Sequence, residues 1–327
     1  MLGSALRRAE STVAPVAGAA TMRAATIAAP GRTQVDVVAT PDPGPGEVLL
    51  RLEGCGLCAS SLPVWEGAPW FEYPLAPGAP GHEGWGVVES LGDGVAGPEP
   101  GTRVAALSYR AFAEHDLAAA AELVPLPPEL DGRPFPGEAI GCAVNAFHRC
   151  RIEPGQRVAV VGAGFLGLLL VQLAARAGAE VTALSRREFA LELALDAGAL
   201  RAFGLEEAPD AEFDCVIEAA GVQATLDLAA RLTRVRGLLV IAGYHQDGPR
   251  QVDLQSWNWR GLDVVNAHER DPAVSVRGMR EGVQLVADGT LELDPLYTHR
   301  FPLERLSDAF EALRTRPDGF LKALVTA

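Results

Sequence analysis

The chain has 327 residues, of which 48% are hydrophobic and 21% charged, enough to build full cores for one large or two ordinary domains. Its formal net charge of −14 argues against binding to nucleic acid or to an anionic membrane, and no apolar run reaches the roughly 18 to 20 residues that span a bilayer. The five cysteines form an odd, scattered set, which speaks against a disulfide framework and predicts a reduced, cytoplasmic location.

The first 21 residues read as neither a strand nor an export signal. Two arginines precede an Ala/Val stretch, but Glu10 and Pro15 interrupt it, and it is short for a signal peptide. We therefore predict a disordered extension over residues 1–21, with strand-like sequence beginning at Met22.

Short strands and turn-rich links follow. The expected strands are Val35–Val38, Glu47–Leu52, Val104–Ala106, Ala111–His115 and Leu123–Leu126. An aromatic loop at 69–74 lies between the second and third of them, and it either walls a substrate channel or is a packed loop. Around Glu138 the pattern becomes helical.

Residues 157–187 carry the most informative pattern. Val158–Val161 suits a buried parallel strand, Leu168–Ala177 a packed helix and Val181–Leu184 a second strand. The first strand leads into a Gly-x-Gly-x-x-Gly turn, whose expected cofactor-binding residues are Gly162, Gly164, Phe165, Leu166 and Gly167. In this context the three glycines tighten the turn, admit a pyrophosphate and let the helix approach the strand. The helix N-terminus also favours phosphate, so the segment predicts a dinucleotide site.

The end of the second strand indicates which dinucleotide binds. An acidic residue there suits the ribose hydroxyls of NAD, whereas an arginine suits the phosphate of NADP. This chain has Ser185, Arg186 and Arg187, and a hydroxyl with two guanidinium groups fits a phosphate dianion. We predict NADP(H) over NAD(H); the alternative is that the arginines are an ordinary solvated helix start.

The later strands supply further candidates near the nicotinamide. A strand from Cys215 runs into Ala219, and another from Leu238 ends at Gly243, and we expect both end residues to line the cofactor. The polar clusters 244–246 and 266–270 also follow strands, a location compatible with lining a pocket, although histidines in loops are commonly just solvated. Trp257 and Trp259 suggest packing or a subunit contact.

Five segments in a fixed order resemble the zinc-type medium-chain alcohol dehydrogenase superfamily. They are the Gly-Leu-Cys58 step, the Gly81-His82-Glu83 box, the glycine turn, Cys215-Val-Ile-Glu-Ala-Ala-Gly221 and the tail Phe301–Phe310. The resemblance covers Met22 to the C-terminus and is specific as a joint pattern. It implies an α/β fold, with a doubly wound Rossmann nucleotide domain and a partly open β-barrel-like (GroES-like) catalytic domain.

The resemblance also implies domain boundaries. The catalytic domain would comprise residues 22–148 and return at 291–327, and the dinucleotide-binding domain would comprise 149–290. Relatives are commonly dimers or tetramers, so a homo-oligomer is expected by analogy.

By resemblance, a catalytic zinc would be held by Cys58 and His82, with Glu83 either a ligand or a nearby carboxylate. The spacing of 24 residues before the glycine turn matches Glu138 with the glutamate that sorbitol- and threonine-dehydrogenase-like relatives use as a further ligand. Cys142, one helical turn later, is the alternative, since zinc accepts carboxylate, imidazole and thiolate. Glu138 is preferred.

The chain departs from the family pattern in two regions. The family's structural zinc needs four closely spaced cysteines after the strand at 104–106, and this chain has none there, so we predict one catalytic zinc and no structural zinc. Ser60 matches the family's proton-relay hydroxyl, but Ser61 replaces the usual neighbouring Asp and Pro63 replaces a histidine often found further on. Proton escape would then use water, a ribose hydroxyl or another histidine, such as His148 or His268.

The sequence thus predicts a zinc-dependent oxidoreductase that transfers a hydride between NADP(H) and a small alcohol or carbonyl substrate. The predicted catalytic residues are Cys58, Ser60, His82 and Glu83. Two alternatives stay open: a zinc-free quinone or enoyl reductase of the same superfamily, and a non-catalytic nucleotide-binding protein. The polar clusters suggest a polyol, amino alcohol or sugar-like substrate, whereas the aromatic loop suggests a more apolar one.

Overall fold

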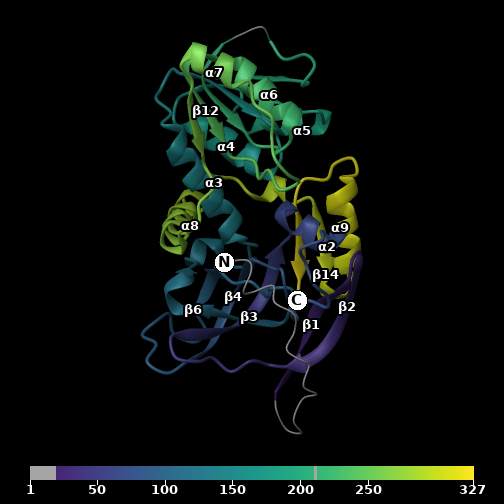
Figure 1. Ribbon diagram of the computed structural model, residues 1–327. Coiled ribbons are helices and arrows are strands. Elements are labelled where there is room, and N and C mark those ends of the chain that lie inside the picture. Colours follow the sequence, from purple (N-terminus) through teal and green to yellow (C-terminus); the bar gives the residue numbers. More distant parts are fainter. Residues whose placement is uncertain (1–19, 210–211) are drawn as a thin grey trace. The chain divides into compact units, whose positions relative to one another are not determined.

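The computed structural model describes residues 20–209 and 212–327, which form two compact units (Figure 1). The first unit runs to Ala139 and resumes at Asp294–Ala327, and the second is Ile140–Leu293. The predicted N-terminal extension lies outside the described residues apart from its last two, and the first strand begins at Thr21.

The first unit is built on antiparallel β-structure. A two-stranded sheet pairs β1 (Thr21–Ala29) with β2 (Arg32–Ala39). A seven-stranded sheet has the order β14-β15-β3-β4-β5-β7, with β6 also paired to β3. Its strands are β3 (Glu47–Gly56), β4 (Glu83–Leu91), β5 (Arg103–Ala106), β6 (His115–Ala119), β7 (Leu123–Pro125), β14 (His299–Pro302) and β15 (Ala323–Thr326).

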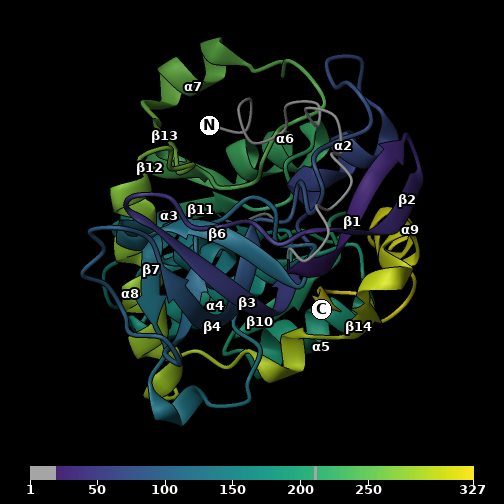
Figure 2. The ribbon, with the colours of Figure 1, turned by 90° about the horizontal axis from the view of Figure 1, so that it is seen from below.

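The C-terminal segment completes this first unit. Strand β15 inserts between β14 and β3. Helix α9 (Leu306–Thr315), in yellow, lies beside the purple strand β2 in Figures 1 and 2. Phe310 of α9 stacks on Trp65 of helix α2 (Leu62–Glu66) at 5.5 Å and meets Phe112 edge-on at 6.0 Å. This aromatic cluster ties the two ends of the chain into one core.

The second unit is a six-stranded parallel sheet with helices between its strands. The strands are β8 (Arg157–Val161), β9 (Glu180–Leu184), β10 (Arg201–Phe203), β11 (Phe213–Glu218), β12 (Thr233–Ile241) and β13 (Asp263–Asn266). The helices are α3 (Gly137–Cys150), whose first residues belong to the first unit, α4 (Phe165–Arg176), α5 (Glu188–Asp196), α6 (Gln223–Leu232), α7 (Leu254–Arg260) and α8 (Pro272–Ala287).

The strand order β10-β9-β8-β11-β12-β13 makes this unit doubly wound. From β8 the chain moves outward through β9 and β10, then returns to the other side of β8 for β11, β12 and β13. The order therefore reverses between β8 and β11, and dinucleotides bind at the carboxyl edge of such a switch point. The predicted α/β class with a doubly wound Rossmann unit is confirmed.

Two predicted elements need correction. Residues 111–114 form an isolated bridge, between Ala113 and Ala24, and no continuous strand, since Ala111 and Phe112 donate their backbone N–H groups to the carbonyls of Gly81 and Gly78; strand β6 begins at His115. The helix after the glycine turn starts at Phe165 rather than Leu168. Trp257 and Trp259, for which the sequence predicted no element, belong to helix α7, which Asp253 caps by accepting from the N–H of Ser256.

The described residues also form five short 3₁₀ turns, of which Ala59–Ser61, after β3, is the one that matters for the site. Across residues 20–209 and 212–327, the structure holds no helix with both the length and the apolar character needed to cross a bilayer.

Candidate metal and nucleotide sites

The register of β3 and β4 explains why two distant segments meet. The two strands are antiparallel, and Gly56, the last residue of β3, pairs with Glu83, the first residue of β4. The chain that leaves β3 and the chain that enters β4 therefore lie at the same end of the sheet. This arrangement places Cys58, two residues after β3, next to His82, one residue before β4.

Gly56 makes room for the carboxylate of Glu83. A Cβ atom added at Gly56 would lie 1.9 Å from Glu83 Oε2 and 2.9 Å from Pro136 Cβ, so any other residue would displace the carboxylate. The glycine is required here by close approach rather than by backbone dihedral angles.

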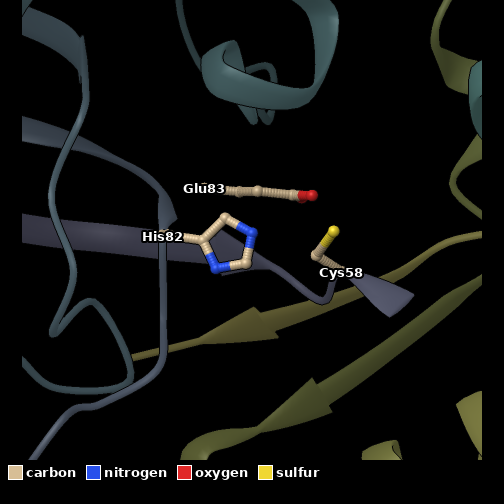
Figure 3. Close-up of side chains that lie close together, drawn as sticks. All are labelled: Cys58, His82 and Glu83. Carbon is tan, nitrogen blue, oxygen red and sulfur yellow. The ribbon is translucent and has the colours of Figure 1, made fainter. Parts of the chain in front are cut away.

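The side chains of Cys58, His82 and Glu83 converge (Figure 3). One ligand atom from each lies within 4.8 Å of the others: a thiol sulfur, a ring nitrogen and a carboxylate oxygen. Ser60 Oγ donates to Cys58 Sγ at 3.1 Å and lies 3.4 Å from His82 Nε2. All four predicted catalytic residues are thus in one cluster.

The backbone fixes which ring nitrogen of His82 faces the cluster. His82 Nδ1 lies 2.9 Å from the carbonyl oxygen of Pro80, which can only accept, so Nδ1 carries a hydrogen and donates it. Nε2 is left to face Ser60 and Cys58. A metal-binding histidine is commonly oriented in this way by a hydrogen bond from its other nitrogen.

The protonation of His82 responds to the acidic groups around it. Burial by itself lowers the pKa of His82. The hydrogen bond and charge of Cys58, reinforced by the charges of Glu138 and Glu83, raise it instead, to about 10. Without a metal the ring is therefore an imidazolium ion. The surrounding acidic groups stabilise a positive charge at this position.

Glu83 is wholly buried, and its two oxygens differ. Oε2 accepts from the ammonium group of Lys322, which is also buried and which precedes β15. Oε1 is buried and has no hydrogen-bond partner among the described residues. A buried carboxylate oxygen without a partner is costly, and a metal ion bound between the three side chains would satisfy it.

Lys322 was not predicted from the sequence. It is the only lysine in the chain, all other basic residues except histidine being arginine, and this was the available signal. Burial by itself lowers the pKa of Lys322, but the charges of Glu83, Cys58 and Glu138 raise it above its ordinary value. The residue is accordingly a buried cation that balances one of the acidic groups.

The donor set fits zinc. Sulfur, imidazole nitrogen and carboxylate oxygen are all zinc ligands, and a catalytic zinc needs three protein ligands with one position open. Glu138, on the first turn of α3, lies outside the group of three but near enough for its charge to act on His82. Whether Glu138 or Cys142, one turn further along α3, completes the set stays a prediction.

The glycine turn after β8 has the geometry that its sequence suggests. Gly162 has a φ of +110°, and a Cβ there would lie 2.9 Å from Ala220 Cβ. A Cβ on Gly167 would lie 1.9 Å from the carbonyl oxygen of Gly162, so helix α4 packs as closely as a glycine permits. Gly164, the N-cap of α4, has open space where its Cβ would be, which leaves room for a ligand.

Comparison with known proteins confirms the predicted pairing of a GroES-like unit with a Rossmann unit. The family model described as "Alcohol dehydrogenase GroES-like domain" matches residues 44–128, and that described as "Zinc-binding dehydrogenase" matches residues 166–274. Sorbitol dehydrogenase from Gallus gallus is 28% identical over 328 residues, which cover 84% of this chain and 88% of that protein. L-galactonate-5-dehydrogenase from Escherichia coli K12 is 26% identical over 334 residues, with 88% and 93% covered.

Among solved structures, a zinc-binding dehydrogenase from Sinorhizobium meliloti 1021 bound to NADP is similar with a TM-score of 0.81. It is 28% identical, and the match covers 94% of this chain and 100% of that one. The chain belongs to the zinc-type medium-chain alcohol dehydrogenase superfamily. The resemblance noted in the sequence is confirmed.

Within this superfamily the proton-relay region of the chain is altered. Ser60 lies in the 3₁₀ turn after β3 and contacts the cluster, as described, whereas Pro63 is in the first turn of α2. Ser61 is buried, with no hydrogen-bond partner for its hydroxyl among the described residues. A relay through a histidine at 63 is therefore impossible in this member.

The residues predicted to choose the dinucleotide follow β9. Ser185 is buried, and its Oγ accepts from the backbone N–H of Arg187, the N-cap of α5. The Arg187 guanidinium lies 5.3 Å from the centre of the Phe189 ring, while Arg186 is exposed. The remaining predicted cofactor residues also lie at the carboxyl edge of the sheet: Ala219 after β11, and Gly243 after β12.

Proposed function

We propose that this member of the superfamily is a zinc- and NADP(H)-dependent oxidoreductase that interconverts an alcohol and its carbonyl compound. The observation that supports the metal most strongly is the cluster of Cys58, His82 and Glu83, in which one buried carboxylate oxygen has no partner among the described residues. The glycine turn between β8 and α4 supports the dinucleotide.

When bound, zinc supplies a Lewis acid that polarises a carbonyl oxygen and lowers the pKa of an alcohol. The chain's own residues do the rest. Cys58 and His82 would hold the ion, and Glu138 is proposed as the further ligand. Glu83, whose Oε2 binds Lys322, would turn its other oxygen to the ion, either as a ligand or as a nearby carboxylate. Ser60 Oγ contacts two of these side chains and is placed to take the alcohol proton and pass it to water.

The preference for NADP(H) is a finer part of the proposal. It is supported by Ser185, Arg186 and Arg187 after β9, with no carboxylate at the strand end, and by the NADP in the related Sinorhizobium meliloti structure. Arg186 is exposed and is the guanidinium group best able to meet a ribose phosphate.

We also propose a polyhydroxylated substrate. Two relatives are named for sorbitol and L-galactonate, and the polar clusters after β12 and β13 point to the same class. A homo-oligomer and a cytoplasmic location stay predictions.

The test is a zinc analysis of the purified protein together with a substrate panel followed by nicotinamide absorbance. Sugar alcohols and sugar acids are compared with aliphatic and aromatic alcohols, each with NADP⁺ and NAD⁺. We expect about one zinc per chain and NADP⁺-dependent oxidation of a polyol. Cys58→Ala should lose zinc and turnover but still bind NADPH, as measured by fluorescence. Turnover by metal-free Cys58→Ala protein would instead support a zinc-free reductase.

A further inference from the structure

Three polar side chains form a buried chain of hydrogen bonds after β11 and β12. Glu218, the last residue of β11, is completely buried, and its Oε2 lies 3.0 Å from His245 Nε2. His245 Nδ1 lies 2.7 Å from Arg250 Nε. The side chains of His245 and Arg250 are only 13% and 14% exposed, so these are not the solvated loop residues that the sequence alone allowed.

The donors and acceptors fix a single arrangement of protons. Arginine has only donors, so Nδ1 of His245 must accept from Arg250. The ring hydrogen is therefore on Nε2, from which it is donated to the carboxylate of Glu218. His245 is a neutral ring that connects a fixed cation to a fixed anion, and each of its nitrogens has a partner.

This chain of hydrogen bonds holds the backbone of two loops. Glu218 Oε1 accepts from the N–H groups of Ala220 and Gly221 at 2.9 and 2.8 Å and from the hydroxyl of Thr225 at 2.7 Å. From the other end, Arg250 Nη2 donates to the carbonyl oxygen of Gly221 at 2.9 Å and also pairs with Asp247. The loop after β11 is therefore held by hydrogen bonds to the N–H groups of Ala220 and Gly221 and to the carbonyl oxygen of Gly221.

The loops after β11 and β12 are in close contact at Gly221 and Gly243. A Cβ atom on Gly243 would lie 2.4 Å from the backbone nitrogen of Gly221 and 2.6 Å from Glu218 Oε2. A Cβ on Gly221, whose φ is +77°, would lie 2.6 Å from the carbonyl oxygen of Tyr244. The loops after β11 and β12 are thus packed directly against each other. The hydrogen bonds of His245 with Glu218 and Arg250 lie at this contact.

The place of this contact in the sheet relates it to one half of the cofactor. The pyrophosphate of a dinucleotide binds at the glycine turn after β8, and the adenosine ribose binds at the end of β9. The other half must extend to the opposite side of β8, over β11 and β12. That is where Ala219–Gly221 and Gly243 lie, next to Gly162, whose Cβ position is 3.0 Å from the nitrogen of Ala220.

We propose that His245 is a positioning residue for the nicotinamide half of the cofactor. Together with Glu218 and Arg250 it holds the loops after β11 and β12 in the shape that receives the nicotinamide and its ribose. None of the three needs to touch the cofactor. The inference rests on the proposed function, since it assumes that a nicotinamide dinucleotide binds.

The test separates the two halves of the cofactor by direct binding. NADPH is compared with 2′-phospho-ADP-ribose, which lacks the nicotinamide, and NADH is compared with ADP-ribose, by calorimetry on the full-length protein. His245→Leu removes both hydrogen bonds, whereas His245→Gln keeps a donor and an acceptor. Arg234→Met is the control. Arg234 lies near the start of β12, at the end of the strand opposite His245, and the substitution breaks its ion pair with Asp214.

We expect His245→Leu to weaken binding of the whole dinucleotide about tenfold while affinity for the nicotinamide-free fragment changes less than about twofold. His245→Gln should recover most of the loss, and Arg234→Met should bind both ligands like the wild type. Equal changes for the dinucleotide and its fragment, or no change for either, would overturn the proposal.

A second variant covers the case in which His245→Leu does not fold. Arg250→Met removes the contacts to His245 and to the Gly221 carbonyl from the outer end of the chain of hydrogen bonds, and the same selective loss is expected, by about threefold or more. Failure of the unaltered protein to bind any of the four ligands is a different result, which removes the proposed function itself.

Discussion

Two buried glutamates, one in each unit, show how a ligand site differs from a scaffold. Glu83 and Glu218 are both completely inaccessible to solvent. Every carboxylate oxygen of Glu218 accepts at least one hydrogen bond, from two backbone amides, a hydroxyl and an imidazole. Glu83 has a lysine on one oxygen and no partner on the other among the described residues.

The number of hydrogen bonds that each carboxylate accepts distinguishes a structural glutamate from one that can bind a ligand. A saturated buried carboxylate holds the backbone in place and has no capacity left for chemistry. A half-satisfied one, next to a thiol and an imidazole, keeps an oxygen that a bound cation would satisfy. The following experiments change one side of this comparison at a time.

The largest effect is expected from Lys322→Met. The substitution removes the buried ammonium group that donates to Glu83 Oε2, and Oε1 already has no partner among the described residues. In metal-free protein we therefore expect a loss of about 3 to 5 kcal/mol in the free energy of unfolding. Urea denaturation of the metal-free protein measures it. The double variant Lys322→Met/Glu83→Gln should recover most of the loss, and equal stability of the single and double variants would contradict the account.

The next effect concerns the ligand supplied by α3. Glu138→Gln should lower zinc affinity by at least about a hundredfold, because a ligand is lost, whereas the matched change Cys142→Ser should alter it by less than about twofold. Competition with a chelator of known affinity gives both values. The opposite pattern would assign the ligand to Cys142.

A third prediction concerns pH. The pKa of His82 in the metal-free protein is about 10, above its ordinary value of about 6.5, so zinc must displace a proton that the folded protein holds. That proton stabilises the metal-free fold below about pH 6.5, and its contribution is lost as the pH rises through about 10. Zinc affinity should therefore rise about tenfold per pH unit over this range.

Calorimetry in two buffers of different ionisation enthalpy checks this directly. At pH 7.5, binding should release about one proton or more from the protein. Zinc binding without proton release, or an affinity that does not change between pH 7 and 9, would show that His82 is neutral before the metal arrives.

The smallest effect is expected on the nucleotide side. Arg186→Ala should weaken NADPH binding about tenfold and NADH binding by less than about twofold, because a charge-assisted contact to the ribose phosphate is removed. Arg176→Ala, an exposed arginine at the far end of α4, is the control and should change neither. An equal loss for the two cofactors would argue against the NADP preference.

A feature can be predicted from the sequence when the residues that determine it are close together in the chain. The nucleotide segment could be predicted closely, because strand, turn and helix follow one another within 31 residues, and the glycines act on their neighbours. The Cys58, His82 and Glu83 cluster needed the family resemblance, since only the register of β3 against β4 brings these residues together.

Other features could not be predicted because their partners are distant or their pattern is ambiguous. Lys322 meets Glu83 across 239 positions of sequence, and nothing near either residue signals the other. The alternation of Trp257, Asn258 and Trp259 resembles a strand as much as a helix, and the capping by Asp253 decides for α7. The partners of His245 depend on how two loops from neighbouring strands pack.

The most direct test of the metal site is X-ray absorption spectroscopy at the zinc edge of the purified protein. We predict one sulfur ligand at about 2.3 Å, with the remaining ligands nitrogen and oxygen at about 2.0 to 2.2 Å. Cys58→Ala protein should hold no zinc that has a sulfur ligand. A zinc ion with no sulfur ligand, or an active protein that binds no zinc, would contradict the assignment of Cys58, His82 and their neighbouring carboxylates as the metal centre.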